Sequence, residues 1–205
     1  NSFLTRPYSK MPLEDDAPAA IFVTAMESEP LAPDASLVLS GQFDSFVMGV
    51  RAISELTRGR IYVCKAINGS VPDIDDLPRV ENHHFGGPHP SGLAGTHMHF
   101  LEAPSSSRTV WSIGYQDVIA IGQLLATGYI NPSRVISIAG PLAVNPRLVR
   151  TVSGVSLDEL IEGEVSPQIP CRVISGSILS GRIGEGAFAY LGRFARQVSL
   201  IKEDT

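Results

Sequence analysis

The order of apolar and polar positions in the first third of the chain predicts a strand, a helix and a second strand. Residues 21–26 form a short apolar run, which is typical of a buried strand. Apolar side chains then recur at helical spacing, at Phe43, Phe46, Val47, Val50 and Ile53. Arg58 and Gly59 suit the end of this helix, and residues 61–67 form the next strand-like run. This order predicts a βαβ unit with two parallel strands and a right-handed crossover.

The same pattern returns between residues 109 and 139. Residues 109–113 resemble a strand, and Gly128 is placed to end the following helix. The apolar face of that helix consists of Val118, Ile121, Gly122 and Leu125. After the turn at Asn131-Pro132, residues 134–139 resemble a strand again. Two such passages predict an α/β layered domain that ends near Pro141.

Beyond Pro141 the pattern changes to short strands with few helices. Residues 148–152 resemble a strand, and Ser156–Glu159 read as a capping box that opens a short helix ending at Gly163. Two further strand-like stretches, 172–179 and 194–202, surround a glycine-rich loop with Gly181, Gly184 and Gly186. We therefore expect a separate small β-rich domain.

These patterns predict three parts. Residues 1–20, rich in proline and acidic side chains, are expected to form an arm or linker. Residues 21–143 are expected to form the layered α/β domain, and residues 144–205 the small β-rich domain. Because predicted edges carry errors of about two to four residues, the boundary is expected between roughly residues 140 and 148.

Composition narrows the class of protein. The chain has 205 residues, of which 43% are hydrophobic and 18% charged, an ordinary balance for a folded protein. Its net charge is -5 and it has no run rich in lysine and arginine, which argues against nucleic-acid binding. No apolar run approaches the roughly 20 residues that span a bilayer, so we expect no transmembrane segment. The start lacks an initiator methionine and a signal peptide, and indicates a cut into a longer protein.

The two cysteines are far apart. Cys64 and Cys171 form no C-x-x-C pair, which argues against an iron–sulfur cluster or a structural zinc site. Both lie in strand-like runs, so we expect two buried, reduced thiols.

All five histidines lie between His83 and His99. His97 and His99 would share one face of an extended segment, and with Glu102 they could form a His–His–carboxylate metal site. If the segment is helical, the two imidazoles point apart. Hydrogen-bonded histidines without a metal are the simpler interpretation.

The same region is dense in glycine and proline. The run Gly86-Gly-Pro-His-Pro-Ser-Gly92 is followed by Gly95, a composition that lets the backbone turn tightly and approach a partner closely. That partner could be a ligand, a neighbouring subunit or the domain's own core. The chain contains no G-x-G-x-x-G and no P-loop pattern, so the usual phosphate-binding loops are not expected.

Two further stretches are candidates for chemistry. Glu27-Ser-Glu-Pro30 follows the first predicted strand, where open α/β sheets bind ligands, and its carboxylates could accept hydrogen bonds from ribose or ribityl hydroxyls. A solvated acidic loop is the alternative interpretation. In the stretch 111–117, Trp111 is expected in the core, and Asp117 suits the first turn of a helix. The spacing reveals no pair of nucleophile and base.

Seven runs of residues, in order along nearly the whole chain, resemble the A subunit of the bacterial sodium-translocating NADH:quinone reductase. The most specific is the long run rich in glycine and histidine. The runs are 20–26, 61–65, 87–100, 115–122, 146–151, 172–177 and 189–193.

This resemblance implies a Rossmann-like layered domain followed by a β-grasp-like domain, of the soluble-ligand-binding kind. It also implies a peripheral subunit on the cytoplasmic face of the bacterial inner membrane. The complex passes electrons from NADH to ubiquinone or menaquinone and exports sodium. The family's N-terminal β-rich domain and C-terminal cysteine-bearing domain are missing here, so this stretch is expected to be inactive alone.

The family is also similar to the flavin-carrying subunit of respiratory complex I. There, a segment resembling Glu27-Ser-Glu-Pro30 helps to hold flavin mononucleotide. The glycine-rich flavin motif of that relative has no counterpart here, so we expect this chain to bind neither NADH nor flavin. Those cofactors are expected elsewhere in the complex.

The leading hypothesis is therefore a part of the complex that supplies a quinone-related or subunit-docking surface, with quinone as its candidate ligand and the other subunits as partners. Its expected ligand-binding or contact residues are Glu27, Glu29, Gly86, Gly87, His89 and His97. No catalytic residue is assigned and no bound metal is expected. The alternatives are a stand-alone metal enzyme that uses His97, His99 and Glu102, and a pure scaffold.

Overall fold

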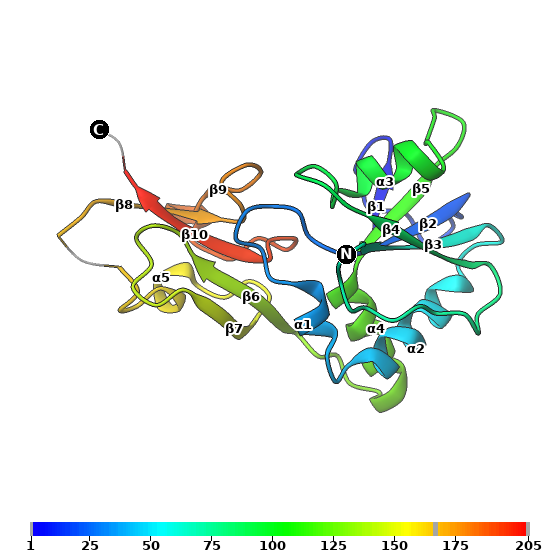
Figure 1. Cartoon of the computed structure of the whole chain (residues 1–205), viewed down its shortest axis with the longest axis horizontal. Helices are drawn as coiled ribbons and strands as arrows, with labels where there is room; N and C mark the ends of the chain where they lie inside the picture. Colours follow the sequence, from blue (N-terminus) through cyan, green and yellow to red (C-terminus); the bar gives the residue numbers. More distant parts are fainter. Residues whose placement is uncertain (1, 166–167, 204–205) are drawn as a thin grey trace. The chain divides into compact units, whose positions relative to one another are not determined.

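The computed structural model describes residues 2–165 and 168–203, and their chain forms two compact units (Figure 1). The first unit contains Asn1–Ser28 and Asp34–Asn131, and the second contains Glu29–Pro33 and Pro132–Thr205. The chain thus passes from the first unit into the second at Glu29 and returns to the first unit after Pro33. These two units differ from the three expected parts, residues 1–20, 21–143 and 144–205. Within those parts, residues 1, 166, 167, 204 and 205 lie outside the described residues.

The first unit is built on a sheet with the strand order β1-β5-β2-β3-β4. Strands β2 to β5 are parallel, and β1 pairs antiparallel with β5. Its elements are β1 (Leu4–Arg6), β2 (Ala20–Ala25), α1 (Ala35–Leu39), α2 (Phe43–Ser54), β3 (Arg60–Ala66), β4 (Val80–Phe85), α3 (Ala94–Leu101), β5 (Val110–Gly114) and α4 (Tyr115–Thr127). Both β2 and β3 are almost entirely buried, which is why their sequences are mostly apolar.

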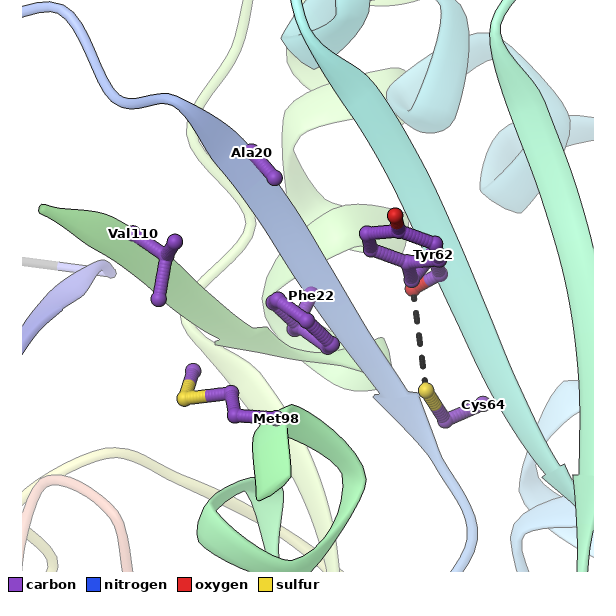
Figure 2. Close-up of a cluster of buried hydrophobic side chains, with 6 residues drawn as sticks. All are labelled: Ala20, Phe22, Tyr62, Cys64, Met98 and Val110. Atoms are coloured by element: carbon purple, nitrogen blue, oxygen red, sulfur yellow. Dashed lines mark hydrogen bonds between the residues drawn. The ribbon is translucent and has the colours of Figure 1, made fainter. Parts of the chain in front are cut away.

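Helices cover the two faces of this sheet. Helices α2 and α4 pack together on one face, and α3 lies on the other (Figure 1). Figure 2 shows the core beneath α3, where Met98 meets Phe22 and Val110 while Tyr62 and Cys64 extend the cluster. The rings of Phe22 and Tyr62 stack with their centroids 4.7 Å apart. These contacts bury the apolar surface that fixes the strand order.

The second unit has its own sheet, with the order β7-β6-β10-β8-β9. Strands β6 and β10 are parallel and the other pairs are antiparallel. Its elements are β6 (Ser133–Ala139), β7 (Arg147–Val152), α5 (Leu157–Leu160), β8 (Cys171–Ser175), β9 (Arg182–Ile183), the 3-10 turn η1 (Gly186–Phe188) and β10 (Gln197–Lys202). Leu157 of α5 packs into a core with Ile136, Ile138 and Leu200. Two sheets, a parallel βαβ unit and a second sheet domain confirm the expected fold class.

Local signals of helix ends are partly confirmed. Gly128 is the C-cap of α4 with φ of 78°, and the Ser156 side chain accepts a hydrogen bond from the Glu159 N–H, as a capping box requires. Helix α2, however, ends at Ser54 rather than just before Gly59. Residues 55–59 turn instead, and the Thr57 hydroxyl donates to the Pro18 carbonyl at 2.6 Å.

The predicted second βαβ unit is wrong. Strand β5 and helix α4 match the prediction, but β6 lies in the second sheet, where it pairs with β7 and β10. The apolar pattern of a strand records its burial and carries no information about which sheet buries it.

Two strands of the first sheet were not anticipated. The segment 1–20, expected as an arm or linker, contributes β1, and the Phe3 ring lies 5.3 Å from that of Trp111. Strand β4 has a polar sequence because it forms an edge of the sheet and is only half-buried.

Candidate functional site

The carboxyl ends of the parallel strands bring two distant loops together in the first unit. Ser28 follows β2, and the glycine-rich loop 86–92 follows β4. The Gly92 N–H donates to the Ser28 hydroxyl oxygen at 2.8 Å, and that oxygen lies 3.2 Å from Nδ1 of His89. Ligands of open α/β sheets bind at this edge. We refer to the turn 27–28 and the loop 86–92 as the loop site.

The loop site depends on one glycine for its close approach. A Cβ on Gly92 would lie 2.6 Å from the Ser28 nitrogen and 2.9 Å from the Glu27 carbonyl carbon, distances that real Cβ atoms do not reach. Both neighbours are backbone atoms, which cannot move aside as a side chain does. At Gly87 the requirement is conformational. Its φ of 106° favours glycine, although a Cβ there would meet nothing within 4 Å.

The loop is closed by its own hydrogen bonds. The Ser91 hydroxyl donates to the Gly87 carbonyl at 2.9 Å, and the Ser91 N–H donates to the Pro88 carbonyl at 3.0 Å. The Leu93 N–H then donates to the Pro90 carbonyl at 3.0 Å, just before α3 begins. These bonds fix the turns of the loop.

His97 supports the loop from beneath and is fully buried. Its Nε2 lies 2.8 Å from the Ser91 carbonyl, so this nitrogen carries the hydrogen and donates it. Its ring lies 4.3 Å from that of Phe85. Burial lowers the pKa of His97 to about 4, although the bond to Ser91 opposes the shift. His97 is therefore a neutral residue that positions the loop, and it does not face solvent.

His89, in contrast, is half-buried and keeps one ring nitrogen available. Within the described residues, its Nε2 has no hydrogen-bond partner. When the Ser28 hydroxyl donates to Nδ1, the ring hydrogen resides on Nε2, which can then donate to an incoming oxygen. Of the loop site's side chains, that of His89 is best placed to meet a ligand.

The structure brings five of the six expected contact residues to one place. Glu27, Gly86, Gly87, His89 and His97 all belong to the loop site or lie directly beneath it. Glu29 does not, because it is part of the second unit, where its carboxylate accepts a hydrogen bond from the Ser180 hydroxyl.

The residues of the alternative metal site do not meet. They lie on or next to α3, where His97 is buried and His99 is exposed against the Phe100 ring. The Glu102 carboxylate accepts a hydrogen bond from the Tyr62 phenol at 2.7 Å and pairs with Arg108. Within residues 2–165 and 168–203, no group of three or more histidine, cysteine, aspartate or glutamate side chains could hold a metal.

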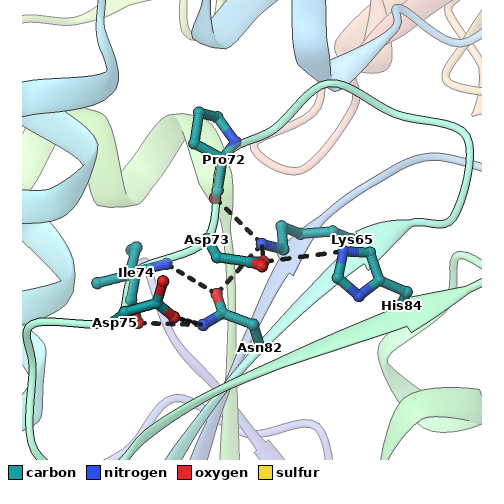
Figure 3. Close-up of polar contacts among 7 residues, drawn as sticks. All are labelled: Lys65, Pro72, Asp73, Ile74, Asp75, Asn82 and His84. Atoms are coloured by element: carbon teal, nitrogen blue, oxygen red, sulfur yellow. Dashed lines mark hydrogen bonds and ion pairs between the residues drawn. The ribbon is translucent and has the colours of Figure 1, made fainter.

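A buried lysine is a feature that the sequence analysis missed. Lys65 near the end of β3 is 1% exposed and pairs with Asp73 (Figure 3). Its ammonium also donates to the Pro72 carbonyl at 3.1 Å and to Oδ1 of Asn82 at 3.2 Å. This ion pair lowers the pKa of the Asp73 carboxyl. A charged residue inside an apolar strand run was the available signal, since buried lysines require partners.

The contacts of Lys65 fasten the long connection between β3 and β4. Asn82 of β4 adds two hydrogen bonds of 3.0 Å with the Ile74 backbone. All the partners of the lysine thus belong to this connection or to β4. The cluster holds the connection against the sheet.

The cysteines are both free thiols. Cys64 is buried in the core beneath α3, and Cys171 is half-buried in β8. Burial raises the pKa of both thiols, that of Cys64 far above its usual range. Neither is a reactive thiolate at neutral pH.

Comparison with protein families gives two adjoining matches. Residues 1–130 match a family model described as the NqrA second alpha/beta domain, and residues 135–185 match one described as the NQRA C-terminal domain.

Relatives named as the A subunit of the Na(+)-translocating NADH-quinone reductase align with nearly the whole chain. The protein from Shewanella amazonensis is 52% identical over 98% of the chain, that from Rhodopirellula baltica 48% over 99%, and that from Vibrio campbellii 51% over 97%. In each case the chain spans 44% of the relative's length.

Part of a solved structure of an NAD+-reducing NiFe-hydrogenase in its H2-reduced state has a similar fold. It aligns with a TM-score of 0.57 and 12% identity, covering 92% of this chain and 41% of its own. At this identity the likeness concerns the fold alone.

None of the helices in the described parts of the chain is long and apolar enough to cross a membrane. The first family model covers more than half of the 205 residues, and the second continues five residues further on. The resemblance inferred from the seven sequence runs is therefore confirmed, and the chain belongs to the NqrA family.

Proposed function

We propose that this chain is part of the A subunit of a sodium-translocating NADH:quinone reductase, a complex that passes electrons from NADH to quinone and exports sodium. The observation that carries this proposal is the 52% identity over 98% of the chain to a relative of that name. On this proposal the chain is a peripheral part on the cytoplasmic face of the membrane. NADH and flavin are bound by other parts of the complex.

Within that complex, the loop site is proposed to contact the quinone headgroup. A quinone presents two carbonyl oxygens, and Nε2 of His89 is a donor of matching chemistry. The glycines of the loop leave its backbone accessible to a flat ring, and its own hydrogen bonds reduce the entropy lost when a ligand binds. The loop site contains no strong nucleophile, so its contribution is binding and orientation.

The metal-dependent alternative is not favoured, because His97, His99 and Glu102 have separate partners. A contact between the loop site and another subunit is a second use of the same loop. If the loop site binds quinone, a substitution there should lower the affinity for quinone. If it contacts another subunit, the substitution should instead impair assembly of the complex.

The test uses the full-length subunit in the purified complex. A strain that lacks the subunit is complemented with the native gene, with His89→Ala, and with His99→Ala as a control on an exposed histidine nearby. Sodium-dependent quinone reduction should return with the native gene, and its absence would reject the proposed function.

His89→Ala removes one hydrogen bond of about 0.5–1.5 kcal/mol, so the KM for quinone should rise about 2- to 10-fold while assembly is retained. His99→Ala should leave the KM unchanged. Loss of assembly with His89→Ala would assign the loop to a subunit contact instead. If both variants behave like the native complex, the loop site has no role in binding.

A further inference from the structure

The second unit has an exposed aromatic and apolar surface beside the edge strand β9, here named the β9 surface. Six large side chains between residues 178 and 194 are each 48–58% exposed: Ile178, Leu179, Ile183, Phe188, Tyr190 and Phe194. Strand β9 ends the sheet order, and only β8 pairs with it among the described strands (Figure 1). Clusters of large exposed apolar side chains mark interaction surfaces.

The structure gives this surface a defined shape. The Arg182 guanidinium lies over the Phe188 ring, 5.0 Å from its centroid. The Gly192 N–H donates to the Ser175 hydroxyl at 2.8 Å, and a Cβ on Gly192 would lie 4.0 Å from Nη2 of Arg182. The chain after β9 therefore folds back beside that strand and places Phe188 and Arg182 on one surface.

The backbone of this segment is fastened at two further points. The Leu157 N–H donates to the Ala189 carbonyl at 3.0 Å, and the Leu191 N–H donates to the Val155 carbonyl at 2.9 Å. Leu191 is buried in the core of the unit. Because the backbone that carries the exposed side chains is already fastened, little backbone order remains to be created when a partner binds.

The charge of the segment is opposite to that of the whole chain. Residues 177–196 contain three arginines, Arg182, Arg193 and Arg196, and one acidic residue, Glu185, which gives the segment a net charge of +2 in a chain whose net charge is -5. The segment contains no lysine. Within the described residues, no carboxylate lies in ion-pair distance of Arg182. A guanidinium stacked on a phenyl ring keeps its in-plane N–H groups available for a carboxylate.

We infer that the β9 surface docks a carboxylate-bearing surface of another protein subunit, with Arg182 binding the carboxylate and Phe188 buried beside it. Arginine and aromatic residues are enriched in protein interfaces, and lysine is depleted there. A bilayer-binding patch would need a cluster of about four to eight basic residues, more than this segment has. The inference rests on the proposed function for the existence of partner subunits.

The test converts the expected ion pair into a covalent link in the assembled complex. Arg182→Lys places an amine at the expected contact, and a carbodiimide joins amines to neighbouring carboxylates without a spacer. Peptide mapping should find the new amine linked to an aspartate or glutamate of another subunit. Arg150→Lys, on the opposite edge strand β7 and also exposed, should give no such link.

Binding is measured with the full-length subunit, added to the complex depleted of it. Arg182→Glu should weaken reassociation about 30-fold or more, as expected for a central interface arginine, and Phe188→Ser should act in the same direction. Arg150→Glu, with the same change of charge, should stay within about 2-fold of the native protein. Circular dichroism should show all variants folded, since the substituted side chains are exposed.

Native-like reassociation of Arg182→Glu would overturn the inference. So would a crosslink that joins the position to a carboxylate of the same chain. If flotation with vesicles of anionic phospholipid depends on Arg182 while reassociation does not, the surface binds lipid and the inference is wrong. None of these results would alter the recovery of quinone reduction by the native gene, so the proposed function can stand or fail separately.

Discussion

Replacing Gly122 by alanine should destabilise the first unit, although alanine is the better helix former. Gly122 of α4 and Gly49 of α2 lie where the two helices cross. A Cβ on Gly122 would lie 2.8 Å from the Ser45 carbonyl carbon, closer still to its oxygen, and 2.9 Å from the Gly49 nitrogen. All of these are backbone atoms of α2, so the helices must separate to accommodate the methyl group.

The size of the effect follows from two opposing terms. Moving the Ser45 carbon out to the 3.4 Å of ordinary contact already requires a helix shift of about 0.6 Å, and the closer carbonyl oxygen requires a larger one. Overpacking of this kind costs about 2–3 kcal/mol where backbone must move. The higher helix propensity of alanine returns about 1 kcal/mol. The net loss in the free energy of unfolding should be about 1–2 kcal/mol.

Gly95→Ala is the matched control, because Gly95 lies in α3 and a Cβ there would meet nothing within 4 Å. It should stabilise the unit by up to about 1 kcal/mol. Urea unfolding followed by Trp111 fluorescence reports the first unit, since Trp111 is the only tryptophan and is buried in β5. With a slope of about 2 kcal/mol/M, the Gly122→Ala midpoint should fall by about 0.5–1 M. A midpoint equal to or above that of the native protein would refute the close helix crossing.

Three further predictions concern buried polar groups and the loop site. His97 has a pKa of about 4 when folded and 6.5 when unfolded, so the unfolded state binds the extra proton as the pH falls from 6.5 towards 4. Stability should drop by about 2 kcal/mol between pH 7.5 and pH 5, and in His97→Gln the urea midpoints at these pH values should differ much less. Asp73→Asn leaves the Lys65 ammonium buried without its counterion. It should therefore lower the urea midpoint more than Lys65→Met does, and more than the control Asp75→Asn. Equal midpoints would contradict the role of the ion pair. Gly92→Ala should displace the turn after β2 and raise the KM for quinone at least as much as His89→Ala, and an unchanged KM would show that the close approach is not needed.

Several elements of both units could be predicted from the sequence, because their signals are local. The runs that became β2 and β3 are mostly apolar, apart from Thr24 and Lys65, because helices cover both faces of the parallel sheet. The end of α4 at Gly128 and the cap at Ser156 depend only on residues within one turn. The glycine-rich loop also stood out by composition, and five of the six residues expected to contact a ligand or subunit lie in or next to the loop site.

The features that sequence reasoning missed all depend on long-range pairing. Strand β6 reads like any buried strand, yet its partners are β7 and β10. Glu29 is two residues from Glu27 and belongs to the other unit, where the Gln197 side chain donates to the neighbouring Pro30 carbonyl at 2.8 Å.

The roles of individual polar side chains were likewise decided by the tertiary structure. His89 lies in the glycine-rich loop and His97 in the helix that follows it, and only their surroundings make His97 a buried neutral support and leave Nε2 of His89 available as a donor. Lys65 is tolerated inside β3 because Asp73 and Asn82 reach it from later segments. Periodicity along a chain reports whether a side chain is buried, whereas the free energy of a buried polar group depends on partners brought together only by folding.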